Sequence, residues 1–130
     1  MAGMANFLET ELFDHVLRGL TWASPATVYM ALYTDDPTDA DAGTDASGDG
    51  YARIVAPSWS AAVDGATANA GLLQFPAADG GNWGPITHAG IRDDITGGNL
   101  IAFCALGAPL TVVDGQVGQI PVGNLDGLAT

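Results

Sequence analysis

The residues best placed to do chemistry are six aspartates in one short segment, at positions 35, 36, 39, 41, 45 and 49. Hard cations such as Ca²⁺ are bound by several carboxylate and carbonyl oxygens. Asp39, Asp41 and Asp45 could provide such oxygens, with Gly43 between them. However, the EF-hand pattern needs a final glutamate and a helix on each side, and neither is evident. We therefore favour a hydrated acidic loop, with these three aspartates as the alternative metal ligands.

The two histidines and the single cysteine are the remaining candidates for catalysis. A hydrolytic site needs a nucleophile, a base and an orienting acid that converge, and the chain contains neither a G-x-S-x-G nor an H-E-x-x-H motif. His15 and His88 are too few for a zinc site, which usually has three or four ligands. We expect His88 to contact a neighbouring loop and Cys104 to be a buried apolar side chain. The sequence thus predicts no catalytic residues, no cofactor and no enzymatic activity.

Three tryptophans offer a different kind of site. Trp22, Trp59 and Trp83 could form a flat platform for sugar rings, which would make the chain a lectin-type binding module, with calcium as a further option. Tryptophan is also a frequent core residue because it buries a large apolar surface. We favour the core interpretation and keep the lectin-type module as the alternative function.

Composition excludes several classes of partner. The chain of 130 residues has a formal net charge of −12, with 15 acidic residues against three arginines and no lysine. Binding to nucleic-acid phosphates needs a basic face, so we expect no nucleic-acid partner. No apolar run approaches the roughly 20 residues of a membrane span, so we expect no membrane association. The acidity fits either a high-salt environment or a surface kept soluble by repulsion.

The elements that must position these residues begin with a helix over 6–19. Asn6 is the expected N-cap, with Glu9 completing a capping box. Leu8, Leu12 and Val16 form one apolar face of this helix together with Phe13, Leu17 and Leu20. Gly19 is expected to end the helix. Residues 1–5 are expected to form a flexible leader.

The remainder, 26–122, is typical of β structure. "TVYMALYT" is apolar or amphipathic on both faces, which indicates an interior strand, and the acidic loop 35–49 follows it. Asp114-Gly115 predicts a hairpin, and Gly97-Gly98 predicts another turn. Residues 6–130 are therefore expected to form a single mainly β domain. It is an antiparallel β-sandwich or open barrel of six to seven strands with one N-terminal α-helix.

Four blocks in this order resemble a family of small tailed-bacteriophage virion proteins, commonly labelled tail fibre proteins. The blocks are "NFLETELFDHVLR", "SPATVYMALYTDDP", "SGDGYAR" and "WGPITHAGIRDDITGGNLIAFCAL". The resemblance covers residues 5 to about 115 and implies a structural component of a virion, located there after synthesis in the host cytoplasm. Two roles fit: a capsid decoration (cement) protein, or a short tail-fibre or spike subunit.

Such a role implies contacts with other virion proteins, namely major capsid or tail proteins. Because virion subunits are repeated, we also expect a homo-oligomer, for which a trimer is a plausible form. Leu8 and Leu12 on the helix, with Trp59 and Trp83 in the β region, are the candidate interface residues.

Overall fold

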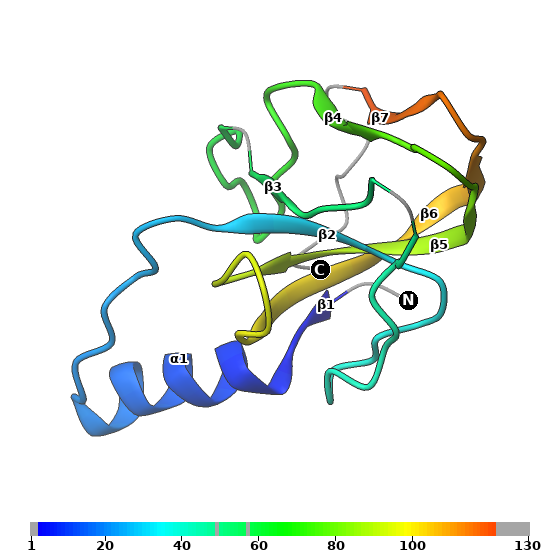
Figure 1. The fold of residues 1–130 in the computed structure, drawn as a ribbon. Helices are drawn as coiled ribbons and strands as arrows, with labels where there is room; N and C mark the ends of the chain where they lie inside the picture. The colour runs from blue at the N-terminus through cyan, green and yellow to red at the C-terminus, as the bar shows by residue number, and fades with distance from the viewer. Residues whose placement is uncertain (1–2, 49, 57, 122–130) are drawn as a thin grey trace.

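The computed structural model describes residues 3–48, 50–56 and 58–121, and in these ranges it has one helix and seven strands (Figure 1). Asp49 and the end of the expected domain beyond Pro121 lie outside the described residues. The helix is α1, Asn6–Arg18. The strands are β1 Gly3–Met4, β2 Tyr29–Tyr33, β3 Ile54–Val55, β4 Leu73–Ala77, β5 Trp83–Arg92, β6 Leu100–Val112 and β7 Val117–Ile120.

These strands form two antiparallel sheets. Five of them make one sheet in the order β1-β6-β5-β2-β3, and β4 pairs with β7 in the other. The long strands β5 and β6 are joined through Gly97 and Gly98, whose φ angles are 61° and 69°. Glycine adopts this left-handed conformation without the steric clash of a Cβ. The turn predicted at these two glycines is confirmed.

The two sheets enclose one hydrophobic core. Met30 and Leu32 of β2 contribute to it from the larger sheet, and Leu73, Phe75 and Ile120 contribute from the smaller one. The expected mainly β fold with one N-terminal helix is therefore confirmed. The arrangement is that of a β-sandwich, and the described strands do not close into a barrel.

Strand β2 is buried on both of its faces, as its sequence predicts. Met30 and Leu32 point into the core between the sheets, whereas Ala31 and Tyr33 belong to a second cluster on the opposite face. All four side chains are at most 1% exposed. The second cluster also contains Ala5, which joins the start of the chain to the sheet.

The predicted hairpin at Asp114-Gly115 is wrong, because the strands on either side of this turn do not pair with each other. The turn is present, with Gly115 at a φ of 84° and a hydrogen bond from the Gln116 N–H to the Val113 carbonyl at 2.8 Å. However, β7 pairs with β4 and not with the preceding β6. The turn therefore carries the chain from the larger sheet to the smaller one.

The N-terminal segment differs from expectation in two respects. The N-cap position of α1 is Ala5, not Asn6, and no side chain caps the helix. The expected flexible leader is also wrong for residues 3–5, because Gly3 and Met4 pair with Phe103 and Ala102 of β6. Gly19 ends the helix as predicted, in the left-handed conformation that glycine tolerates.

Candidate functional site

The most unusual surface lies on α1, which Figure 1 shows extending away from the sheets. Its first turn is fixed, because the N–H of Ala5 donates to Ile101 of β6 at 2.9 Å and the N–H of Asn6 donates to Asp39 at 2.8 Å. Beyond that turn the helix makes little contact with the two sheets and their loops, which we call the body. None of the helix residues is buried. The helix is therefore held mainly at its N-terminal end.

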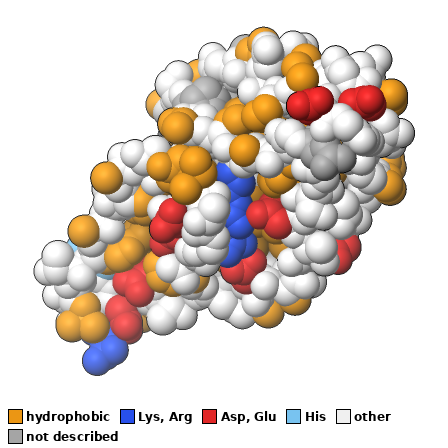
Figure 2. Space-filling model, in the orientation of Figure 1, with side chains coloured by type: hydrophobic (Ala, Val, Ile, Leu, Met, Phe, Trp, Pro, Cys, Tyr) orange, Lys and Arg blue, Asp and Glu red, His pale blue; other side chains and the backbone are white. Residues whose placement is uncertain are grey.

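The exposed part of α1 and the residue after its C-cap present five large apolar side chains to solvent. Their exposed fractions are 38% for Leu12, 61% for Phe13, 65% for Val16, 74% for Leu17 and 46% for Leu20. We call these five residues the apolar stripe. Figure 2 shows apolar side chains along this part of the molecule and basic atoms at its far end.

An ordinary surface helix buries its apolar face, whereas α1 leaves most of its apolar side chains exposed. Glu11 and Asp14 are half-buried, while the apolar stripe is exposed. Arg18 forms an ion pair with Asp14 one turn earlier at 3.1 Å. A ring nitrogen of His15 is 2.9 Å from the Leu20 carbonyl. Glu11 and Asp14 are thus the less exposed side chains of the helix, whereas Arg18 and the apolar stripe are exposed to solvent.

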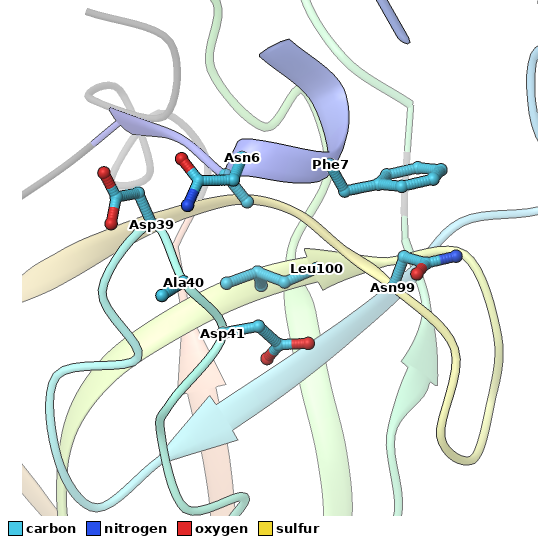
Figure 3. A pocket seen from close by; sticks show the side chains of 8 residues that line it. Asn6, Phe7, Asp39, Ala40, Asp41, Asn99 and Leu100 are labelled. Atoms are coloured by element: carbon cyan, nitrogen blue, oxygen red, sulfur yellow. The ribbon is translucent and has the colours of Figure 1, made fainter. Parts of the chain in front are cut away.

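A small hollow of about 220 Å³ lies where α1 meets the acidic loop (Figure 3). Asn6 and Phe7 of the first turn line it together with Asp39, Asp41 and Leu100. Asp39 is exposed beside the N-terminal end of the helix, whereas Asp41 points toward the sheet. The two neighbouring aspartates therefore have different environments.

Asp41 is held by Arg92 at the end of β5. The Arg92 guanidinium donates two hydrogen bonds to the Asp41 carboxylate, at 2.7 and 2.9 Å. It also donates to the Tyr33 hydroxyl at 3.0 Å and to the carbonyls of Gly97 and Gly98. The Arg92 side chain is only 8% exposed, so these acceptors replace its hydration.

Asp45 is held in the same way by Arg53. Two guanidinium nitrogens of Arg53 donate to one Asp45 carboxylate oxygen, at 2.9 and 2.6 Å. A third nitrogen donates to the carbonyls of Asp94 and Gly97 in the β5–β6 turn. Two arginines therefore join the acidic loop to this turn. The loop, which was expected to be simply hydrated, is fixed at Asp41 and at Asp45.

Short-range contacts shift several pKa values in this region. Burial raises the pKa of Tyr33, and it also raises that of Tyr51. Burial alone would lower the pKa of Arg92, but the hydrogen bonds to Asp41 and Tyr33 outweigh it and raise that pKa. The N–H and hydroxyl of Thr44 lower the pKa of Asp35. These shifts keep the tyrosines neutral and the arginine charged at neutral pH.

The candidate metal ligands are not brought together. Asp41 and Asp45 are paired with separate arginines, and Asp39 is exposed near the helix. Within the described ranges, no three His, Cys, Asp or Glu side chains are placed to share a metal ion. The geometry gives Asp41 and Asp45 the role of anchoring the loop.

The histidines and the cysteine lie apart. His88 Nε2 is 3.8 Å from an Asp36 carboxylate oxygen, which agrees with the expected contact to a neighbouring loop. His15 lies near the far end of α1. Cys104 is 5% exposed within the core, as its apolar neighbours predict. These residues do not form one reactive cluster.

The tryptophans differ in their burial. Trp83 is fully buried and meets the edge of Tyr51 at a centroid distance of 5.2 Å. It therefore cannot be the interface residue or sugar platform that its position at a strand entrance suggested. Trp59 is half-buried and packs against the core, and Leu8 is half-buried in the first turns of α1. Of the four candidate interface residues, only Leu12 belongs to the apolar stripe.

A second hollow, of about 530 Å³, lies between the acidic loop and the β5–β6 turn. Tyr51, Ala52 and Ile95 line it beside Asp45 and Arg53. Its charged groups already pair with each other, so it offers a partner mainly apolar contact.

Sequence reasoning did not identify the two arginine anchors. Arg53 and Arg92 are the only basic residues of the body apart from His88, in a chain with 15 acidic residues. That scarcity, and the position of Arg92 in an apolar strand, is the signal that could have indicated buried ion pairs.

This geometry describes a β-sandwich with an amphipathic N-terminal helix whose apolar stripe is exposed. The model of the family "Podophage GP4 fiber I protein gp80" matches residues 3–127. The chain therefore belongs to this family of phage fibre proteins, and it is a structural component of a phage virion. No curated protein matches the chain. In the described part of the chain, α1 is too short and too polar to cross a membrane.

Proposed function

We propose that the chain is a short tail-fibre or spike subunit that joins the virion through the apolar stripe of α1. The observation that supports this most is the exposed apolar stripe. Five large apolar side chains are 38–74% exposed, and complete burial of a fully exposed side chain of this kind is favourable by about 1.5–3 kcal/mol, so covering the stripe would contribute the part of that free energy that corresponds to the exposed area. A 13-residue helix held mainly at its first turn is also marginal by itself, so a contact along the stripe would stabilise it.

The family description favours a fibre over a capsid decoration protein, since it names a fibre. In this role the chain has no enzymatic activity and binds no nucleic acid, because its surface is strongly anionic. Its partners are other virion proteins and further copies of itself. For the lectin-type alternative, Trp83 is fully buried and cannot contribute to a sugar platform, which leaves the half-buried Trp22 and Trp59.

Labelling of intact virions tests this proposal. Gold-conjugated antibodies against the β-sandwich are applied to purified particles, and their positions are recorded by electron microscopy. We expect label at the tail. Label spread over the capsid surface would instead establish a decoration protein, and particles without label would refute a virion role for the chain.

A further inference from the structure

We propose that Asp64 is a site of spontaneous covalent modification, at which the Asp64-Gly65 peptide rearranges through a succinimide to isoaspartate. The site lies in the segment between β3 and β4 (Figure 1), outside α1 and its apolar stripe. Its chemistry is independent of the fibre role. Three features of the described residues support it: the sequence of the pair, the hydrogen bonding of the glycine N–H and the exposed turn that holds both residues.

An aspartate followed by glycine is prone to this rearrangement. Glycine has no side chain to obstruct its own amide nitrogen, and it lets the chain bend toward the preceding carboxyl group. The sequence contains five such pairs. Three of them lie wholly within the described residues: Asp64-Gly65, Asp79-Gly80 and Asp114-Gly115. All three aspartates are exposed, so exposure alone does not distinguish them.

The hydrogen bonds of the glycine N–H groups distinguish the three pairs. The N–H of Gly80 donates to the Asp114 carboxylate at 2.8 Å, and the N–H of Gly115 donates to the Ala78 carbonyl at 2.7 Å. Each of these nitrogens must lose its hydrogen bond before it can act as a nucleophile. The N–H of Gly65 has no acceptor among the residues that the structure describes. Of these three glycine nitrogens, that of Gly65 is therefore the one ready to attack.

The turn that holds Asp64 and Gly65 is exposed and strained. Val63 and Ala66 on either side are joined by two reciprocal N–H to carbonyl hydrogen bonds of 2.9 Å, and the φ angles of Asp64 and Gly65 are 51° and 79°. Two positive φ angles fit a type I′ turn, but a non-glycine residue adopts one only at a cost. Val63 is 66% exposed, and no described atom beyond the neighbouring residues lies within 4 Å of the place a Gly65 side chain would take. The turn can therefore open locally without loss of packing.

The rearrangement releases one water molecule and takes one up. The Gly65 nitrogen loses its proton and attacks the side-chain carboxyl carbon of Asp64, so that a C–N bond forms, the C–OH bond breaks and water leaves. Water then adds to one of the two carbonyl carbons of the resulting succinimide ring. Opening at the side-chain carbonyl restores aspartate. Opening at the main-chain carbonyl gives isoaspartate, in which the main chain runs through the former side chain and is longer by one carbon.

Ageing of the purified, folded chain at neutral pH tests the proposal. Chymotrypsin cleaves after aromatic residues and leucine, which places Asp64, Asp79 and Asp114 on separate peptides. Electron-transfer fragmentation of these peptides distinguishes isoaspartate from aspartate. We expect isoaspartate to accumulate at Asp64 several times faster than at Asp79 or Asp114. Equal accumulation at the three positions, faster accumulation at either of the other two, or none at Asp64 would refute the proposal.

The same chain unfolded in urea is the control for the sequence around each pair. Unfolding removes the hydrogen bonds of Gly80 and Gly115, so we expect the three rates to become similar. If the rate at Asp64 exceeded the other two by the same factor in urea, the neighbouring residues and not the fold would cause the preference, and the inference would fail.

Ageing in water enriched in a heavy oxygen isotope tests the succinimide route. Hydrolysis of the ring places an oxygen atom from the solvent in the product, so we expect the isoaspartate at Asp64 to carry the isotope. Isoaspartate without the isotope would refute this route.

The variant Asp114→Ala tests the protective role of the hydrogen bonds. It removes the acceptor of the Gly80 N–H and leaves the turn at Asp64 unchanged. We expect isoaspartate to form several times faster at Asp79 in this variant, and to form at Asp64 at the rate of the unchanged chain. Circular dichroism shows whether the variant folds. An unchanged rate at Asp79 in the folded variant would show that hydrogen bonding does not control the reaction, and it would overturn the inference.

Discussion

Arg92 at the end of β5 and Asp41 in the acidic loop form a two-bonded ion pair, with nitrogen–oxygen distances of 2.7 and 2.9 Å. The two residues are 51 positions apart in the chain. Because the guanidinium also donates to the Tyr33 hydroxyl, the pair joins the loop to β2 as well as to β5. The most acidic segment of the molecule is thereby a fixed part of the surface near the base of α1.

Replacing Asp41 by Asn should lower the free energy of unfolding by about 1–3 kcal/mol, because it leaves a buried cation without its charged acceptor. Asp39→Asn is the matched control, since Asp39 is exposed, and it should change stability by less than about 0.5 kcal/mol. Urea unfolding of both variants measures the difference. Equal effects would show that the ion pair does not anchor the loop.

Replacing Trp83 by Ala should cost about 3–5 kcal/mol, since the indole is fully buried between the sheets and its loss leaves a cavity. The same change at the half-buried Trp22 should cost less. Denaturant unfolding followed by circular dichroism compares the two. A Trp83 variant with nearly unchanged stability would contradict the core role of this side chain.

Stability should depend on Asp93 in a pH-dependent way. Burial acts to raise its pKa, but hydrogen bonds from the Asn99 N–H and side chain hold the pKa below the ordinary 3.8. A carboxylate with a lowered pKa stabilises the fold above the unfolded value, and this contribution is lost as the pH falls through the folded value.

The test compares the unfolding free energy of the unchanged chain with that of the Asp93→Asn variant from pH 7 down to below pH 3.8. Their difference in unfolding free energy should be constant between pH 7 and about 5 and should shrink as the pH falls below 3.8. Unfolding curves at a series of pH values measure it. A difference that grows toward acid would reverse the sign of the assigned shift.

The exposed apolar stripe should contribute little to the stability of the isolated subunit. Phe13→Ala and Leu17→Ala are each expected to change it by less than about 0.5 kcal/mol under dilute, monomeric conditions. Leu32→Ala, at 0% exposure in β2, should cost about 2–5 kcal/mol. Thermal or urea unfolding at low protein concentration measures all three. A large loss at Phe13 or Leu17 would mean that the stripe packs on its own body.

Local patterns in the sequence predicted much of the fold. The apolar or amphipathic residues on both faces of β2 indicated its burial, Gly19 marked the end of the helix, and the pair Gly97-Gly98 marked a turn between strands. These features depend on neighbouring residues and intrinsic conformational preference. The pairing of β7 with β4 could not be predicted in the same way, because Asp114-Gly115 specifies a turn and not the strand that the chain meets afterwards.

The candidate site was harder to predict, for two physical reasons. An amphipathic helix has the same pattern whether its apolar face meets its own core or another subunit, so the stripe on α1 could not be assigned an orientation. Ion pairs such as Arg53–Asp45 and Arg92–Asp41 depend on tertiary placement, and six aspartates were available to two arginines. The choice of Trp83 as a candidate interface residue was wrong, because a position at the start of a strand does not determine whether a side chain is buried.

The most direct test of assembly through α1 is the composition of virions made with Leu17→Glu in place of the unchanged chain. Quantitative mass spectrometry of purified particles measures the amount of this subunit relative to the other virion proteins. The variant should fold in solution yet be lost from the particles by at least tenfold, while Val63→Glu is incorporated normally. Incorporation of a folded Leu17→Glu subunit at the level of the unchanged chain would contradict assembly through the apolar stripe.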